Sequence, residues 1–68
     1  MELHMIRIVG RKSEAAKIVL SETVGEAFVE LGLSTQRYVA ILNGMPCTSD
    51  RKFKESDELV FMEVFSGG

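Results

Sequence analysis

The chain has 68 residues, of which 46% are hydrophobic and 26% charged, with a formal net charge of −2. A chain of this length forms one small domain with little room for a buried pocket, which argues against a self-contained enzyme. The balance of charge gives no electrostatic footprint for nucleic acid. No apolar run approaches the ~18 residues of a membrane span, and no signal-peptide pattern opens the sequence.

Cys47 is the only cysteine, so the chain cannot form an internal disulfide and cannot hold a metal with cysteine ligands alone. Its two interpretations are a small hydrophobic residue, which is the commoner role, and a redox thiol. A domain without disulfides or a signal peptide is expected to be cytoplasmic. We expect no cofactor and no metal site.

Two strands are predicted before the first helix. Residues 3–9 alternate with apolar side chains on both faces, as in a central strand: Ile6 and Ile8 share one face, and Met5 lies on the other. A polar turn over residues 10–14 leads to a second strand over residues 15–20. The two strands are expected to form a hairpin.

The best-defined element is a short helix. Thr23 and Glu26 have the spacing of a capping box, in which each side chain bonds the backbone N–H of the other residue. Gly32 supplies the left-handed residue that ends many helices, and Leu33 stands where a Schellman motif places its apolar contact. The helical spacing of the apolar residues predicts one buried stripe, formed by Val24, Ala27, Phe28 and Leu31.

Three further strands are predicted after the helix. Residues 38–42 form the third, and Asn43-Gly44 is the dipeptide favoured in type I′ hairpin turns. The short fourth strand, residues 45–47, contains Pro46, which cannot donate to a ladder and therefore predicts a sheet edge. A loop over residues 51–58 is expected to be solvated around a buried Phe53. The last strand covers residues 59–65.

The order β-β-α-β-β-β, together with three motifs, resembles the ubiquitin-like β-grasp family. The motifs are Leu42-Asn43-Gly44, the acidic turn Glu55-Ser56-Asp57-Glu58-Leu59, and the tail Phe65-Ser66-Gly67-Gly68. Similar motifs occur in the thiamine-pathway sulfur carrier, the small subunit of molybdopterin synthase and archaeal ubiquitin-like modifiers. Ser56 stands where that family usually has glycine, which bears on the turn type. The resemblance implies an α+β fold with a mixed sheet of four to five strands covered on one face by one helix.

The resemblance also implies a carrier and not an enzyme. Residues 1–65 would form the domain, and residues 66–68 a flexible diglycine tail. An ATP-dependent adenylating enzyme, similar to ubiquitin-activating enzymes, would activate Gly68, and Ser66 and Gly67 would be recognised with the tail. A persulfide would then convert the activated carboxylate to a thiocarboxylate, which donates sulfur to an acceptor enzyme.

Two alternatives stay open at this point. In the first, the chain is a ubiquitin-like modifier that becomes joined through Gly68 to lysines of target proteins. In the second, it is a β-grasp binding module without covalent chemistry. The iron–sulfur version of the fold is excluded by the single cysteine, since such a cluster needs four ligands. We expect a monomer that binds neither nucleic acid nor membrane.

The alternation of the last strand predicts a partner-binding surface. Leu59 and Phe61 are expected to face the helix, so that Val60, Met62 and Val64 point away from it. By resemblance to ubiquitin, Ile41 on the third strand would join them. Contiguous outward apolar residues are typical of recognition surfaces, whereas isolated ones are ordinary.

Overall fold

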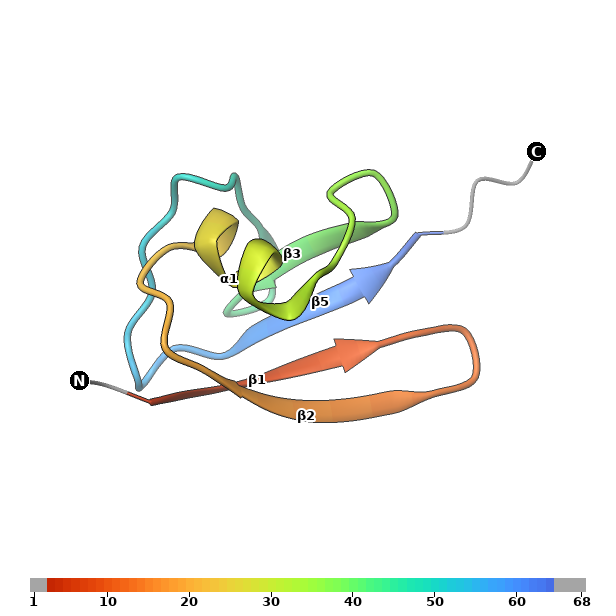
Figure 1. Ribbon diagram of the computed structural model, residues 1–68, viewed down its shortest axis with the longest axis horizontal. Coiled ribbons are helices and arrows are strands. Elements are labelled where there is room, and N and C mark those ends of the chain that lie inside the picture. The colour runs from red at the N-terminus through yellow and green to blue at the C-terminus, as the bar shows by residue number, and fades with distance from the viewer. Residues whose placement is uncertain (1–2, 65–68) are drawn as a thin grey trace.

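The computed structural model describes residues 3–64, which form a five-stranded mixed sheet with one helix packed across one face (Figure 1). In chain order the elements are β1 (His4–Val9), β2 (Glu14–Val19), α1 (Val24–Leu31), β3 (Tyr38–Leu42), β4 (Met45–Pro46) and β5 (Leu59–Glu63). The predicted α+β class and element order are confirmed, and the arrangement is compatible with a β-grasp fold.

The last strand lies in the middle of the sheet. The strand order is β2-β1-β5-β3-β4, with β5 parallel to β1 and antiparallel to β3. Phe61 of β5 is opposite Ile8 on one side and Ala40 on the other. β5 therefore joins the two hairpins, and the sheet cannot form without it.

Helix α1 begins and ends as its sequence predicts. Thr23 Oγ1 accepts the N–H of Glu26 at 3.2 Å, and Glu26 Oε1 accepts the N–H of Thr23 at 3.1 Å. At the other end Gly32 has φ 69°, and the N–H of Leu33 donates to the carbonyl of Phe28 at 2.9 Å. This 6→1 bond is that of a Schellman motif, so the local sequence fixes both ends of the helix.

The hydrophobic core lies between α1 and the sheet. Phe28 and Phe61 meet edge to face with their ring centroids 4.7 Å apart. Phe53 reaches into the core from the loop after β4, as predicted. The core residues are all less than a tenth exposed: Ile6, Val19, Val24, Ala27, Phe28, Ala40, Leu42, Phe53, Leu59 and Phe61.

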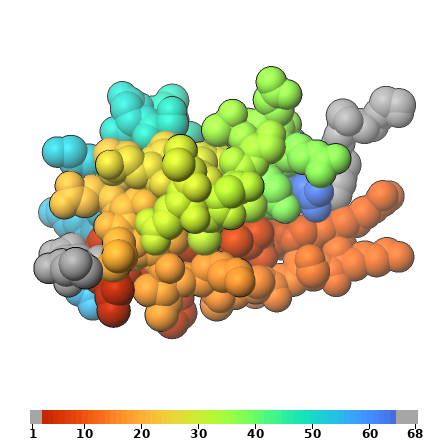
Figure 2. Space-filling model, viewed as in Figure 1, coloured from red at the N-terminus to blue at the C-terminus, as the bar shows by residue number. Residues whose placement is uncertain are grey.

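The helix covers only part of the sheet. Val19 is fully buried at the end of β2, while the rest of that strand, from Glu14 to Ile18, is exposed. Glu14, Ala16 and Ile18 are exposed because they alternate onto the face away from the helix. Figure 2 shows that the β1–β2 hairpin, in orange, extends beyond α1, in yellow-green, so the helix side of β2 is also uncovered there.

The two internal motifs of the predicted family contact each other. Asn43 and Gly44 have φ values of 52° and 84°, as a type I′ turn requires. The Asn43 amide donates to Asp57 Oδ1 at 3.0 Å and accepts the N–H of Glu58 at 2.8 Å. Asp57 also accepts the N–H of Lys54 at 2.8 Å. The hairpin turn and the acidic turn therefore stabilise each other across 14 residues of sequence.

Some predicted boundaries shift by a residue. β1 begins at His4 and β2 covers Glu14–Val19, one residue earlier than predicted. β4 ends at Pro46, although the N–H of Cys47 still donates to the carbonyl of Ala40 at 3.0 Å. β5 ends at Glu63; the predicted strand residue Phe65 and the tail over residues 66–68 lie outside the described residues.

Candidate functional site

The predicted partner-binding residues on β5 alternate between the two faces of the sheet. Leu59 and Phe61 are 1% and 0% exposed and face α1. Val60 is half-buried and Met62 is 41% exposed, and by alternation both lie on the face away from the helix, which we call the outer face. The predicted inward and outward phase of β5 is confirmed.

Strand pairing brings residues of β3 beside them. Ile41 is opposite Val60, and Val39 is opposite Met62. Ala40 and Leu42 are buried, so Val39 and Ile41 share the outer face, and the predicted position of Ile41 agrees with the structure. We call the residues that share this exposed apolar surface the outer patch: Val39, Ile41, Val60, Met62 and Val64.

Val64 continues the patch just beyond the strand. It is 44% exposed, and its N–H donates to the carbonyl of Arg37 at 2.7 Å. This bond keeps the chain beside the start of β3 after the strand has ended. Residues 66–68, which carry the predicted activation and tail-recognition positions Ser66, Gly67 and Gly68, follow two positions later and are outside the described part of the chain.

The sequence interpretation missed several residues of the outer face. Val39 is 39% exposed, while Met5 on β1 and Ile18 on β2 are opposite each other and 68% and 59% exposed. In β3 four consecutive residues are apolar, so the sequence shows no alternation between an inward and an outward face. In β1 both faces are largely apolar, so the sequence does not distinguish the buried face from the exposed one. The pairing register, which only the fold supplies, would have identified them.

One ion pair interrupts the apolar outer face. Arg7 lies on β1 next to Val60, and its side chain bonds the Glu14 carboxylate, with Nε 3.1 Å from Oε2. The pair is more than two fifths exposed, so it contributes little to stability. It separates the outer patch from Met5 and Ile18. A partner that contacts both apolar regions would therefore have to accommodate these two charges.

Cys47 lies beside β3, with its Sγ 3.7 Å from the carbonyl oxygen of Ala40, and it packs against the core. Burial raises the pKa of its thiol, against a smaller opposite influence of the Arg51 charge. A thiol with a raised pKa is largely protonated at neutral pH and is a poor nucleophile. These features favour the interpretation of Cys47 as a small hydrophobic residue.

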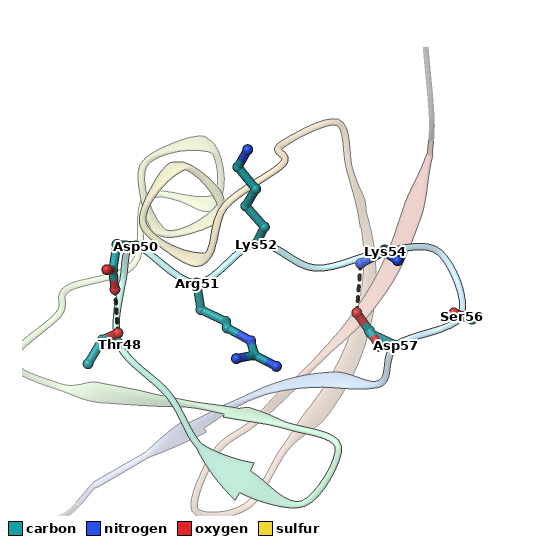
Figure 3. Close-up of a pocket in the computed structure, with 7 residues that line it drawn as sticks. All are labelled: Thr48, Asp50, Arg51, Lys52, Lys54, Ser56 and Asp57. Atoms are coloured by element: carbon teal, nitrogen blue, oxygen red, sulfur yellow. Dashed lines mark hydrogen bonds between the residues drawn. The ribbon is translucent and has the colours of Figure 1, made fainter.

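A second surface feature lies in the loop between β4 and β5. An open hollow of about 670 Å³ is lined by polar and charged side chains of this loop, shown in Figure 3: Thr48, Asp50, Arg51, Lys52, Lys54, Ser56 and Asp57. Burial of Phe53 agrees with the prediction for this loop, whereas the hollow itself was not predicted.

Residues 3–64 contain no cluster of three or more histidine, cysteine, aspartate or glutamate side chains that could hold a metal ion. In the same part of the chain no helix is long and apolar enough to cross a membrane. Comparison with known proteins found no matching family model and no matching curated sequence.

Proposed function

We propose that the protein is a small carrier whose Gly68 carboxylate is adenylated by a separate enzyme and then converted to a thiocarboxylate. The observation that carries this proposal is the arrangement of β5. This strand pairs with both β1 and β3 and buries Leu59 and Phe61 in the core. It presents Val60 and Met62 on the outer face and precedes the diglycine in the sequence. A partner bound to the outer patch would thus be placed near the start of the tail.

The chemistry implied by the resemblance needs nothing from this chain except its carboxylate. A carboxylate is a poor electrophile because it is charged and has no good leaving group. Attack by a Gly68 oxygen on the α-phosphorus of ATP would form an acyl-adenylate and release pyrophosphate. A persulfide sulfur would then attack the carbonyl carbon and release AMP, and reduction of the resulting acyl disulfide by a thiol would leave the thiocarboxylate.

The features of the tail suit such a reaction. Gly67 and Gly68 have no side chain, so an activating site can close tightly around their backbone. Capture of a C-terminal carboxylate by backbone N–H groups is a recurring form of peptide recognition. The catalytic groups would belong to the activating enzyme, and the protein would act as its substrate.

Adenylation can be tested by exchange of labelled pyrophosphate into ATP, which reports the first step alone. With the chain ending at Gly68 and a cognate activating enzyme, exchange should depend on the added protein. Deletion of Gly67 and Gly68 should abolish the exchange. Exchange that persists without the two glycines would contradict the proposal.

A further inference from the structure

The loop over residues 48–57 is held in place by its backbone. The N–H groups of Val24 and Gly25, at the start of α1, donate to the carbonyls of Arg51 and Ser49 at 2.9 and 2.8 Å. The N–H of Phe53 donates to the carbonyl of Glu22 at 3.1 Å, and the Phe53 ring is buried in the core. Side chains on this loop are therefore presented by a fixed frame, which lowers the ordering cost of binding a ligand.

The two carboxylates of the hollow are already engaged within the loop region. Asp50 accepts the hydroxyl of Thr48, which lowers the pKa of Asp50 and keeps it ionised at neutral pH. Asp57 accepts the Asn43 amide and the N–H of Lys54. Each of these acids thus has hydrogen-bond donors from its own surroundings.

The cations Arg51 and Lys54 act on Asp57 through the attraction of their charges, after its hydrogen bonds from Asn43 and Lys54 the smaller cause of its lowered pKa, but they are not hydrogen-bonded as the acids are. Within residues 3–64 the side chains of Arg51 and Lys54 make no hydrogen bond or ion pair. Figure 3 shows Arg51 pointing into the space between the loop and the β3–β4 hairpin, whereas the neighbouring Lys52 points to the opposite side, along α1. The guanidinium of Arg51 therefore offers unused N–H donors, which suit an oxyanion.

A second hollow of about 300 Å³ shares the lining residue Arg51 with the first. Arg51 is charged and Asn43 is polar, and the other residues that line this hollow are apolar: Leu42, Met45, Pro46 and Cys47. A ligand with its anionic group at Arg51 would therefore have an apolar surface next to it. We call the two hollows that share Arg51 the Arg51 cleft.

We propose that the Arg51 cleft binds an organic phosphate. Arg51 and Lys54 contact the phosphoryl oxygens, and the apolar part of the ligand lies against Met45 and Pro46. A phosphoryl group fits better than a carboxylate because its additional oxygens can accept from several donors at once. This site is independent of the carrier function, since it lies in the β4–β5 loop and needs neither Gly68 nor the outer patch.

The test is an NMR titration of the ¹⁵N-labelled protein with phenyl phosphate, with inorganic phosphate and sodium chloride at matched ionic strength as comparisons. Phenyl phosphate should give saturable shifts of amide signals in residues 48–57 and at Met45. Inorganic phosphate should bind the same loop more weakly, because it does not fill the apolar hollow. Shifts that sodium chloride reproduces would overturn the site, and equal affinity for both phosphates would overturn its apolar part.

Three substitutions separate a built site from general electrostatic attraction. Arg51→Ala should weaken phenyl phosphate binding by about tenfold or more, as expected for loss of a charge-assisted hydrogen bond. Lys17→Ala removes the same charge from β2, at the opposite edge of the sheet from β4, and should change the affinity by less than about twofold. Asp50→Asn should strengthen binding by about threefold, because it removes a nearby negative charge. Equal effects of Arg51→Ala and Lys17→Ala would overturn the proposal. Weaker binding by Asp50→Asn, with its amide spectrum unchanged, would also overturn it.

Discussion

Replacing Met62 by glutamate places a carboxylate in the middle of the outer patch, between Val39 on β3 and Val9 on β1. Met62 is 41% exposed, so about three fifths of its side chain is covered in the free protein. Full burial of such a side chain contributes about 1.5–3 kcal/mol, and glutamate keeps part of the contact. The substitution should therefore cost about 1 kcal/mol of folding stability, and the protein should remain folded.

The effect on partner binding should be larger. A carboxylate in the apolar centre of an interface loses contact area and must be desolvated, which we expect to cost about 2 kcal/mol, or about thirtyfold in affinity. Calorimetric titration against the activating enzyme measures this. Val29→Glu is the matched control, because Val29 is 82% exposed on α1, on the other side of the sheet. Equal affinities of Met62→Glu and wild type would refute the outer patch as a binding surface.

Two further predictions concern the fold. Phe28→Ala removes a buried ring that packs on Phe61, so it should lower the free energy of unfolding by about 3–5 kcal/mol and leave little folded protein. A melting temperature within a few degrees of wild type would show that α1 is not a core element. Hydrogen bonds from the Asn43 amide and, to a smaller extent, from the N–H of Lys54 lower the pKa of Asp57. The ionised Asp57 therefore stabilises the fold at pH values above the pKa of unfolded aspartate, and this contribution is lost as the pH falls through the lower folded pKa. Urea unfolding of wild type and Asp57→Asn should thus differ most at neutral pH and converge in acid, and a difference that does not change with pH would contradict this role.

Local sequence predicted the elements whose conformation depends on a few neighbouring residues. Thr23 and Glu26 determine the start of α1, and Gly32 its end, because capping bonds form within one turn. Asn43-Gly44 determines the hairpin turn because both positions need positive φ. The phase of β5 followed from its alternation, since buried Leu59 and Phe61 leave the intervening residues on the other face.

Features that depend on residues distant in sequence could not be predicted in the same way. The contact between Asn43 and Asp57 joins two turns, each of which was identified on its own. Val39 escaped notice because β3 is apolar on both faces, so its side is decided by pairing with β5. The Arg51 cleft depends on backbone bonds from the start of α1 to the loop, for which neither segment carries a sequence signal.

The mass of the intact protein tests most directly the proposal that Gly68 carries the chemistry. After incubation with ATP, the activating enzyme, a persulfide donor and a thiol, the mass should rise by about 16 Da, because one carboxylate oxygen is replaced by sulfur. A variant that lacks Gly67 and Gly68 should keep its mass under the same conditions. If the enzyme supports pyrophosphate exchange with the wild-type chain but its mass does not change, the sulfur-carrier proposal is contradicted. New protein adducts in the same reaction would instead indicate conjugation to lysines.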